Sequence, residues 1–141
     1  MGRTKTILVV DDEPAVLHEV KALFEGYEYE VLTETDSRAG LQTALTHQPD
    51  LILLDVTTPG LDGFEVLRRL KYQPATRQIP VIMLSPTNDT HSVLLSQDLQ
   101  ASDFIIKPFE RQELLRLVVR CLALKTLGRS SARAGLKPDG G

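Results

Sequence analysis

The sequence has few of the features that mark secreted, membrane or nucleic-acid-binding proteins. It contains one cysteine, Cys121, so it can form no internal disulfide and no cluster of thiols for zinc. Its 16 basic and 19 acidic side chains give a net charge of -3, without the basic excess that phosphate-backbone binding requires. No apolar run approaches the roughly 20 residues that span a bilayer, and the start of the chain lacks the apolar core of a secretory signal. We therefore expect a cytoplasmic protein that binds neither nucleic acid nor membrane.

Length and composition indicate a single compact domain. Of the 141 residues, 42% are apolar, 25% are charged and only 5% are aromatic, a balance typical of globular proteins and unlike that of fibrous or disordered chains. After residue 128 the chain is rich in Gly, Ser and Arg and has too few apolar residues to form a core. We expect a domain over residues 4–125 and a flexible tail or linker over residues 126–141.

Short apolar runs alternate with longer segments of helical spacing, a pattern that indicates parallel strands covered by helices in a doubly wound α/β sheet. The run around Val31 is bordered by Glu30 and Glu34 and is interpreted as an edge strand. The other runs are predicted to be buried on both faces. The predicted strands cover residues 7–10, 30–33, 51–54, 81–84 and 104–106.

Helix start and stop signals lie between these runs. Pro14 suits the first turn of a helix that Gly26 ends. Asp36 or Ser37 is expected to cap a second helix, which must end before Pro49. Three further helices are predicted, one that carries Val66, Leu67 and Leu70, one over residues 90–99 and one over residues 111–125.

The last of these helices is expected to end at Gly128 and to carry two apolar stripes. The second stripe either widens the core-facing surface or forms, with residues 90–99 and 104–106, a face that dimerises or binds a downstream protein target. The first stripe is Leu114, Leu117, Val118, Cys121 and Leu124, and the second is Leu115, Val119 and Leu122.

Acidic residues stand where two predicted strands end. Asp11 and Asp12 follow the first strand and Asp55 follows the third, so the three carboxylates should meet at one edge of the sheet. Such a cluster requires a compensating cation or protons, and oxygen ligands without His or Cys favour Mg²⁺. Two plainer interpretations stay open: the adjacent pair caps the helix that starts at Pro14, and Asp55 opens a turn.

A hydroxyl and an ammonium stand at the ends of the last two strands. Ser85 ends the fourth strand and Lys107 ends the fifth. With the acid cluster they suit phosphoryl transfer, in which a carboxylate is the nucleophile while a metal, a hydroxyl and an ammonium hold the phosphoryl oxygens. Taken singly, Lys107 would be a surface lysine and Ser85 a strand-end cap, and their joint placement favours the chemical interpretation.

These motifs resemble those of the receiver domain of two-component response regulators. The matching stretches are ILVVDDEP, DLILLDVTTPGLDGFEVLRRL, PVIMLS and DFIIKPF, at residues 7–14, 50–70, 80–85 and 103–109. The resemblance implies an α/β fold of one domain, with a five-stranded parallel sheet doubly wound in the flavodoxin-like order 2-1-3-4-5. It also implies a phosphoprotein that acts as a signalling switch and turns over no separate substrate.

The resemblance implies a role for each residue of the acid cluster. Asp55 would be the phospho-acceptor, and a sensor histidine kinase or a phosphotransfer protein would supply the phosphoryl group. Asp12 would bind Mg²⁺ directly, whereas Asp11 would act through water or shape the site. The Thr57 backbone carbonyl and Asp55 itself would be further metal ligands.

Residues of the last two strands gain roles in the same way. Ser85 and Lys107 would contact the phosphoryl group, and the peptide between Lys107 and Pro108 would be cis. Phe104 occupies the place of the family's aromatic switch residue, whose rotamer follows the position of the strand-four hydroxyl, here Ser85. Plain core packing is the alternative for Phe104, because it lacks the hydroxyl of Tyr.

One position departs from the family pattern. The residue after the strand-four hydroxyl is usually small, and its backbone N–H donates to a phosphoryl oxygen. Here it is Pro86, which has no N–H. We therefore expect a weaker or shorter-lived phosphoryl state.

Two other functions fit part of the pattern. The haloacid dehalogenase phosphatases also use an aspartyl phosphate, but their second catalytic acid lies two residues after the first, where this chain has Thr57. A receiver-like interaction module that works without phosphorylation is the alternative within the same fold. Pro86 favours that alternative, whereas the complete set of acids with Lys107 favours a working switch.

Overall fold

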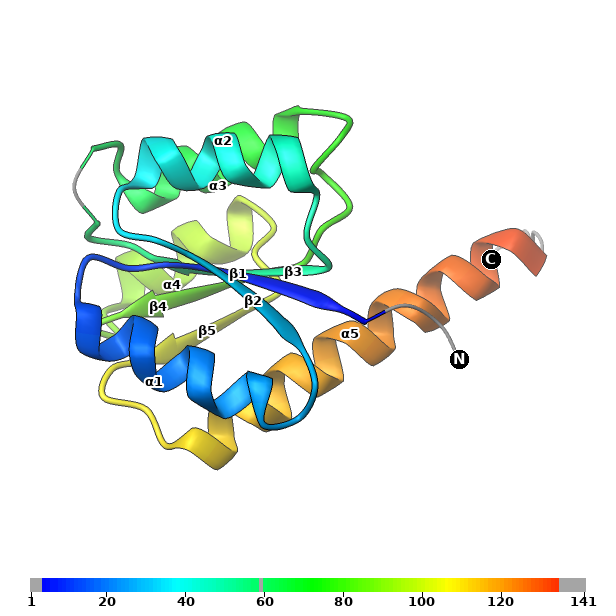
Figure 1. Cartoon of the computed structure of the whole chain (residues 1–141). Coiled ribbons are helices and arrows are strands. Elements are labelled where there is room, and N and C mark those ends of the chain that lie inside the picture. Colours follow the sequence, from blue (N-terminus) through cyan, green and yellow to red (C-terminus); the bar gives the residue numbers. More distant parts are fainter. Residues whose placement is uncertain (1–3, 59, 135–141) are drawn as a thin grey trace.

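The sheet has five parallel strands in the order β2-β1-β3-β4-β5 (Figure 1). The computed structural model describes residues 4–58 and 60–134, and from residue 126 onward only their helical backbone. The strands are β1 (Thr6–Val10), β2 (Glu30–Glu34), β3 (Leu51–Asp55), β4 (Val81–Ser85) and β5 (Asp103–Ile106). The helices are α1 (Pro14–Glu25), α2 (Ser37–His47), α3 (Gly63–Tyr72), α4 (Thr90–Asp98) and α5 (Arg111–Ala134). The predicted flavodoxin-like doubly wound order is therefore confirmed.

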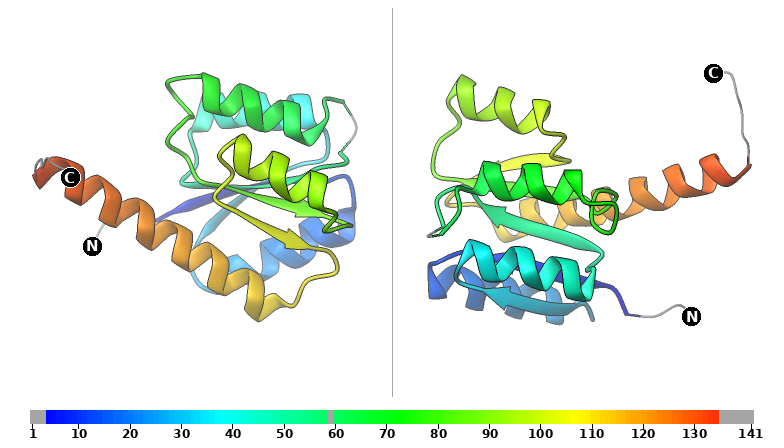
Figure 2. Two further views of the ribbon diagram at one scale, coloured as in Figure 1. Left: turned by 180° about the vertical axis from the view of Figure 1, so that it is seen from behind. Right: turned by 90° about the horizontal axis from the view of Figure 1, so that it is seen from above.

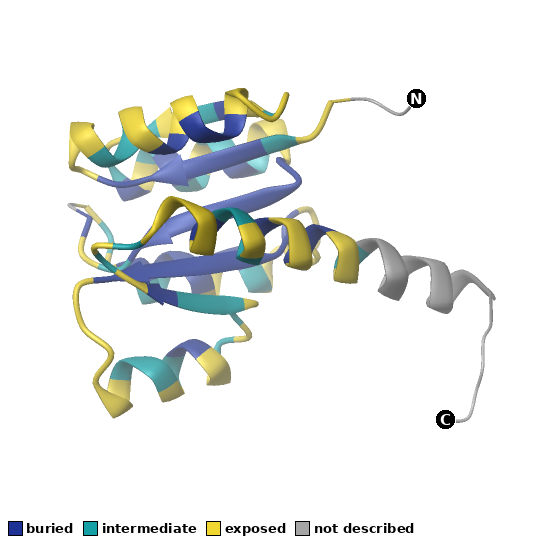
Figure 3. Cartoon of the chain, turned by 90° about the horizontal axis from the view of Figure 1, so that it is seen from below, coloured by how far each residue is buried: buried dark blue, intermediate teal, exposed yellow. Residues whose placement is uncertain are grey.

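Alternating strand residues build a core on each face of the sheet, because successive side chains of a strand point to opposite sides. On one face Ile7 and Val9 belong to a buried cluster that includes residues of α1 and α5. On the other face Leu8 and Val10 belong to a cluster that includes residues of α2 and α3. Figure 2 shows the helices in these two layers, with α4 beside α3, and Figure 3 shows buried strands between helices with exposed outer faces.

Most predicted element boundaries are confirmed to within a residue or two. Pro14 is the first residue of α1 and Gly26 follows its last turn, as the sequence predicts. Asp36 is the cap of α2, where its carboxylate accepts a hydrogen bond from the Ala39 N–H at 3.0 Å. The alternative that the acidic pair caps α1 is wrong, because the cap position is Glu13 and it makes no side-chain capping bond.

The prediction that β5 is buried on both faces is wrong. In this strand Ile105 is buried, Phe104 is half-buried and Ile106 is 38% exposed. The reason is the strand order, since β5 pairs with β4 and forms an edge of the sheet as β2 does. Short apolar runs at an edge and in the centre look alike in sequence, whereas only the central ones have neighbours on both sides.

The prediction that Gly128 ends the last helix is also wrong, because α5 continues to Ala134. A glycine inside a helix costs about 1 kcal/mol relative to alanine, which the helix formers around it can offset. Residues 135–141 of the predicted tail lie outside the described residues, and the domain boundary at 125 stays a prediction. No helix in the described part of the chain is long and apolar enough to cross a membrane.

The two apolar stripes of α5 are divided differently from the prediction. Leu122 is buried and Leu115 packs against the same core cluster, so for these two residues the wide core-facing stripe is the correct alternative. Leu124, predicted to lie in the core, is 58% exposed, and Val119 of the second stripe is 47% exposed. Val119 directly follows the buried Val118, so it lies on the outer face of α5. Figure 1 shows that the later turns of α5 run past the edge of the sheet.

Strand register brings the carboxyl ends of four strands to one edge. Val10 pairs with Leu54, and Asp55 pairs with Leu84 in the next strand. Ser85 in turn lies opposite Ile106. The residues that follow β1 and β5 and those that end β3 and β4 therefore meet at the same edge, as the sequence predicts.

Gly63, the first residue of α3, packs directly on the backbone after β3. A Cβ at this position would lie 2.6 Å from the Asp55 carbonyl oxygen and 2.6 Å from the Val56 Cα. The Gly63 N–H also donates to the Val56 carbonyl oxygen at 3.2 Å. Because backbone atoms cannot move aside as a flexible side chain can, the start of α3 requires a residue without a side chain.

Replacing Gly63 with alanine should destabilise the fold by about 1 to 3 kcal/mol, the usual cost of overpacking. Urea denaturation gives the free energy of unfolding. The matched control is Gly26→Ala, at a φ of -65° where the nearest atom to a new Cβ is 3.3 Å away. The control should be neutral or stabilising by up to about 1 kcal/mol. Equal effects of the two substitutions would contradict the packing described here.

Candidate functional site

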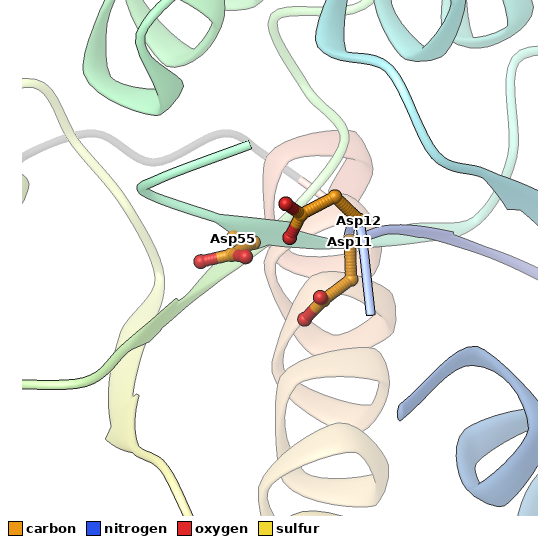
Figure 4. A group of neighbouring side chains, drawn as sticks. All are labelled: Asp11, Asp12 and Asp55. Atoms are coloured by element: carbon orange, nitrogen blue, oxygen red, sulfur yellow. The ribbon is translucent and has the colours of Figure 1, made fainter. Parts of the chain in front are cut away.

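Three carboxylates meet at the carboxyl edge of the sheet, as the sequence predicts. Asp11 and Asp12 follow β1 and Asp55 ends β3, and Figure 4 shows the three side chains gathered there. One oxygen from each lies within 4.8 Å of the others. Asp11 and Asp55 are 0% and 1% exposed, whereas Asp12 is exposed. Two carboxylates of the cluster are therefore buried, and the third is open to solvent.

Lys107 crosses from the end of β5 to this cluster. Its Nζ lies 2.9 Å from Asp11 Oδ2 and 3.5 Å from Asp55 Oδ2. It also lies 2.8 Å from Glu13 Oε1, a contact that the sequence analysis missed. The signal available for Glu13 was its place as a third acid directly after Asp11 and Asp12. The ammonium compensates part of the negative charge of the cluster.

The electrostatics of the cluster follow from burial and from this ammonium. Burial raises the pKa of the Asp11 carboxyl above its ordinary value and the Asp55 charge adds to this, although hydrogen bonds from the Glu13 N–H and Lys107 oppose it. Burial alone would lower the pKa of Lys107, but its bonds to Glu13 and Asp11 and the nearby carboxylate charges outweigh that cost and raise the pKa. Lys107 is therefore a permanent cation in the site.

The two oxygens of Asp55 have different surroundings. Oδ1 accepts hydrogen bonds from the Thr57 N–H at 3.1 Å and from the Thr57 hydroxyl at 3.2 Å. Oδ2 is buried and accepts no hydrogen bond from the described residues, so the ammonium of Lys107 at 3.5 Å interacts with it through charge. A buried acceptor without a donor is costly, by about 1 to 3 kcal/mol. Oδ2 is thus the atom of the site best prepared to bind a cation or to react.

The donor set fits a hard divalent cation. Asp11, Asp12 and Asp55 offer carboxylate oxygens, the ligands that Mg²⁺ prefers, and the cluster includes no His or Cys. The buried Oδ2 of Asp55 is an acceptor that a cation would satisfy. The exposed Asp12 leaves room for the waters that Mg²⁺ usually keeps.

A pocket opens over the cluster and gives access from solvent. Its lining includes Asp12, Asp55, Thr57, Pro86 and Lys107. It extends between α1 and the residues after β5, with Val16 and Phe109 among its apolar walls. Four of the predicted site residues therefore line the same pocket: Asp12, Asp55, Thr57 and Lys107. The predicted residues Asp11, Ser85 and Phe104 are not part of its lining.

The hydroxyl of Ser85 is not directed to the acid cluster. Ser85 is fully buried at the end of β4, and its Oγ donates to the Thr87 carbonyl oxygen at 2.7 Å. The same Oγ accepts from the Thr87 N–H at 3.1 Å. A tight turn with Pro86 at its centre thus satisfies the hydroxyl through the backbone.

The remaining predicted features differ in outcome. The peptide between Lys107 and Pro108 is cis, as predicted. Phe104 is half-buried and packs against the cluster that includes residues of α2 and α3. This packing accounts for Phe104 without a switch role, which stays a prediction.

Comparison with known proteins identifies relatives of this arrangement. A family model described as the response regulator receiver domain matches residues 7–119. The response regulator ArlR of Staphylococcus aureus is 37% identical to this chain over 109 residues, which make up 77% of this chain and 48% of ArlR. The chain thus spans about half the length of the curated relatives that it matches.

Two solved structures of receiver domains are similar over most of the chain. A CheY-like response regulator receiver domain protein from Methanospirillum hungatei JF-1 has a TM-score of 0.85 at 25% identity, covering 89% of this chain and 99% of its own. The receiver domain of the sensor histidine kinase PA1611 from Pseudomonas aeruginosa PAO1 has a TM-score of 0.79 at 27% identity, covering 86% and 99%. That structure has a magnesium ion coordinated in its active site cleft.

Proposed function

The chain belongs to the response regulator receiver domain family, and from this membership we propose that it is a phosphorylation-dependent switch whose phospho-acceptor is Asp55. Receiver domains are signalling modules of two-component systems that interact with histidine kinases and downstream effectors. The observation that carries the proposal is the state of the Asp55 carboxylate. Its Oδ2 is buried and unsatisfied, beside the ammonium of Lys107 and below a pocket open to solvent.

The chemistry follows from these positions. Asp55 Oδ2 attacks the phosphorus of a phosphohistidine or of a small acyl phosphate, and a new O–P bond forms as the bond to the donor breaks. The electron pair of the broken bond leaves with the donor, so no oxidant or further reactant is required. Lys107 offers its ammonium to the phosphoryl oxygens that arrive at Oδ2, because it already lies 3.5 Å from that atom.

Asp12, Asp55 and the Thr57 carbonyl would hold Mg²⁺, with Asp11 acting through water or by shaping the site. The bound ion would neutralise negative charge on the transferring group. The all-oxygen donor set supports this assignment. The magnesium ion in the receiver domain of PA1611 supports it by analogy.

A second candidate is a receiver-like interaction module that works without phosphorylation. The turn at Pro86 favours it, because Ser85 directs its hydroxyl to Thr87 and not to the phospho-acceptor. The complete acid cluster with Lys107 favours the phosphorylated switch, since a module without this chemistry has no need of an unsatisfied buried carboxylate. We therefore prefer the switch, with a cytoplasmic kinase or phosphotransfer protein as the donor.

The protein partners beyond the donor belong to the same proposal. Leu94 of α4, Ile106 of β5 and Val119 of α5 are exposed apolar side chains on the three elements expected to form the output face. A downstream target or a second copy of the chain would dock there. No turnover of a separate substrate is expected.

Incubation with acetyl phosphate and Mg²⁺ should add the mass of one phosphoryl group to the protein, as measured by mass spectrometry of the intact chain. The adduct should be absent from Asp55→Asn and should not form in EDTA, because the nucleophile or the cation is then missing. An adduct of equal yield in Asp55→Asn would place the acceptor elsewhere. An unmodified wild-type protein would support the module that works without phosphorylation.

Replacing Pro86 with alanine should lengthen the lifetime of the phosphorylated state. The substitution supplies a backbone N–H for a phosphoryl oxygen and loosens the turn that holds the Ser85 hydroxyl. A hydrogen bond to a charged group is worth about 1.5 to 3 kcal/mol, so the lifetime should rise by about tenfold or more. Loss of the adduct over time by mass spectrometry measures this, and an unchanged or shorter lifetime would refute it.

A further inference from the structure

The loop after β3 is tied to the first turn of α2. Ser37 is fully buried, and its Oγ donates to the Leu61 carbonyl oxygen at 2.6 Å. Beside it, Gly60 has a φ of +98° and lies so close that a Cβ there would be 2.7 Å from Asp36 Oδ1 and 2.9 Å from Ser37 Oγ. Two successive residues of the loop therefore rest directly on the start of α2.

The hydroxyl of Ser37 is not needed to cap its own helix. That task belongs to Asp36, whose carboxylate accepts from the Ala39 N–H. A serine at the first position of a helix is ordinarily exposed to solvent, where its hydroxyl can bond to water. Here the buried hydroxyl crosses to a different segment of the chain, 24 residues away.

The near end of the same loop is anchored at β3 and β4. The Val56 N–H donates to the Leu84 carbonyl oxygen at 3.0 Å, and the Thr58 hydroxyl donates to the Asp55 carbonyl oxygen at 3.3 Å. Thr57 lies between the two anchors, outside any helix or strand, and both of its donors reach Asp55 Oδ1. The loop that carries Thr57 is therefore held at the strands on one side and at α2 on the other.

We propose that Ser37 is a positioning residue that, through the Leu61 carbonyl, keeps Thr57 in place on Asp55. The inference rests on the proposed function, because Thr57 matters to the reaction by holding the nucleophile and by presenting its carbonyl to Mg²⁺. Without the Ser37 hydroxyl, the Leu61 carbonyl loses its buried donor and the loop is held at the β3 end and at α3. Thr57 then leaves Asp55 Oδ1 for part of the time.

A matched pair of substitutions separates positioning from ordinary stability. Ser37→Ala removes the bond to the loop. Thr76→Val removes an equivalent bond elsewhere, since the fully buried Thr76 Oγ1 donates to the Leu70 carbonyl oxygen at 2.7 Å, in the loop before β4 at the opposite edge of the sheet. Urea denaturation should show losses of stability of the same order for both, because each substitution leaves one carbonyl without its hydroxyl donor.

Only Ser37→Ala should affect the site. Amide exchange of Thr57, measured by NMR without metal, should become about tenfold faster, the equivalent of one lost hydrogen bond. The Kd for Mg²⁺, measured by calorimetry, should rise by about tenfold, the low end of the effect of residues that support metal ligands. The inference would be overturned if Ser37→Ala kept the wild-type exchange rate of the Thr57 amide and the wild-type Kd for Mg²⁺. It would also be overturned if Thr76→Val changed both quantities as much as Ser37→Ala does.

Gly60→Ala is a second test that leaves the Ser37 hydroxyl in place. A side chain at Gly60 collides with Asp36 and Ser37, so it should push the loop away and reproduce both changes at the site. If neither Ser37→Ala nor Gly60→Ala changes the exchange rate of the Thr57 amide, Ser37 has only a structural role. If wild-type protein binds no Mg²⁺, the proposed function fails, and the exchange rate of the Thr57 amide still decides whether Ser37 positions it.

Discussion

The site depends on the contacts of one ammonium, that of Lys107, with several carboxylates. Lys107 lies within 3.5 Å of oxygens of Asp11, Glu13 and Asp55, and its own burial would disfavour its charge if those oxygens were absent. One ammonium cannot neutralise three nearby acids, and Asp55 Oδ2 remains without a hydrogen bond. The edge of the sheet therefore keeps an excess of negative charge, which favours the binding of a cation.

The fold supplies this arrangement by placing strand ends side by side and by holding the loops between them. Gly63 packs on the backbone after Asp55, so α3 begins against the site. Ser37 holds the other part of that loop on α2, and the Pro86 turn binds the Ser85 hydroxyl. The loop after Asp55, the proposed nucleophile, is thus held by α2 and α3 as well as by its own strand.

Sequence reasoning predicted the elements that have a strong local signal. Buried runs that end in Asp11 and Asp55 predicted both the strands and the acid cluster, because parallel strands end at a common edge. The direction of the Ser85 hydroxyl and the contact of Ser37 with the loop depend on backbone turns and on packing between distant segments, which periodicity does not encode. The exposure of β5 was missed because an edge strand and a central strand look alike as short apolar runs. The end of α5 was missed because the helix continues through Gly128.

The central claim is that the acid cluster carries uncompensated negative charge and binds Mg²⁺. The dependence of the free energy of unfolding on Mg²⁺ tests this claim most directly. Urea denaturation of the wild-type chain, in EDTA and then at rising Mg²⁺, should show stability that increases above the Kd by about 1.4 kcal/mol for each tenfold rise in Mg²⁺. Asp55→Asn should be more stable than the wild type in EDTA, because it removes a buried charge, and should lose most of the Mg²⁺ response. A wild-type protein indifferent to Mg²⁺, or an equal response in Asp55→Asn, would contradict the account.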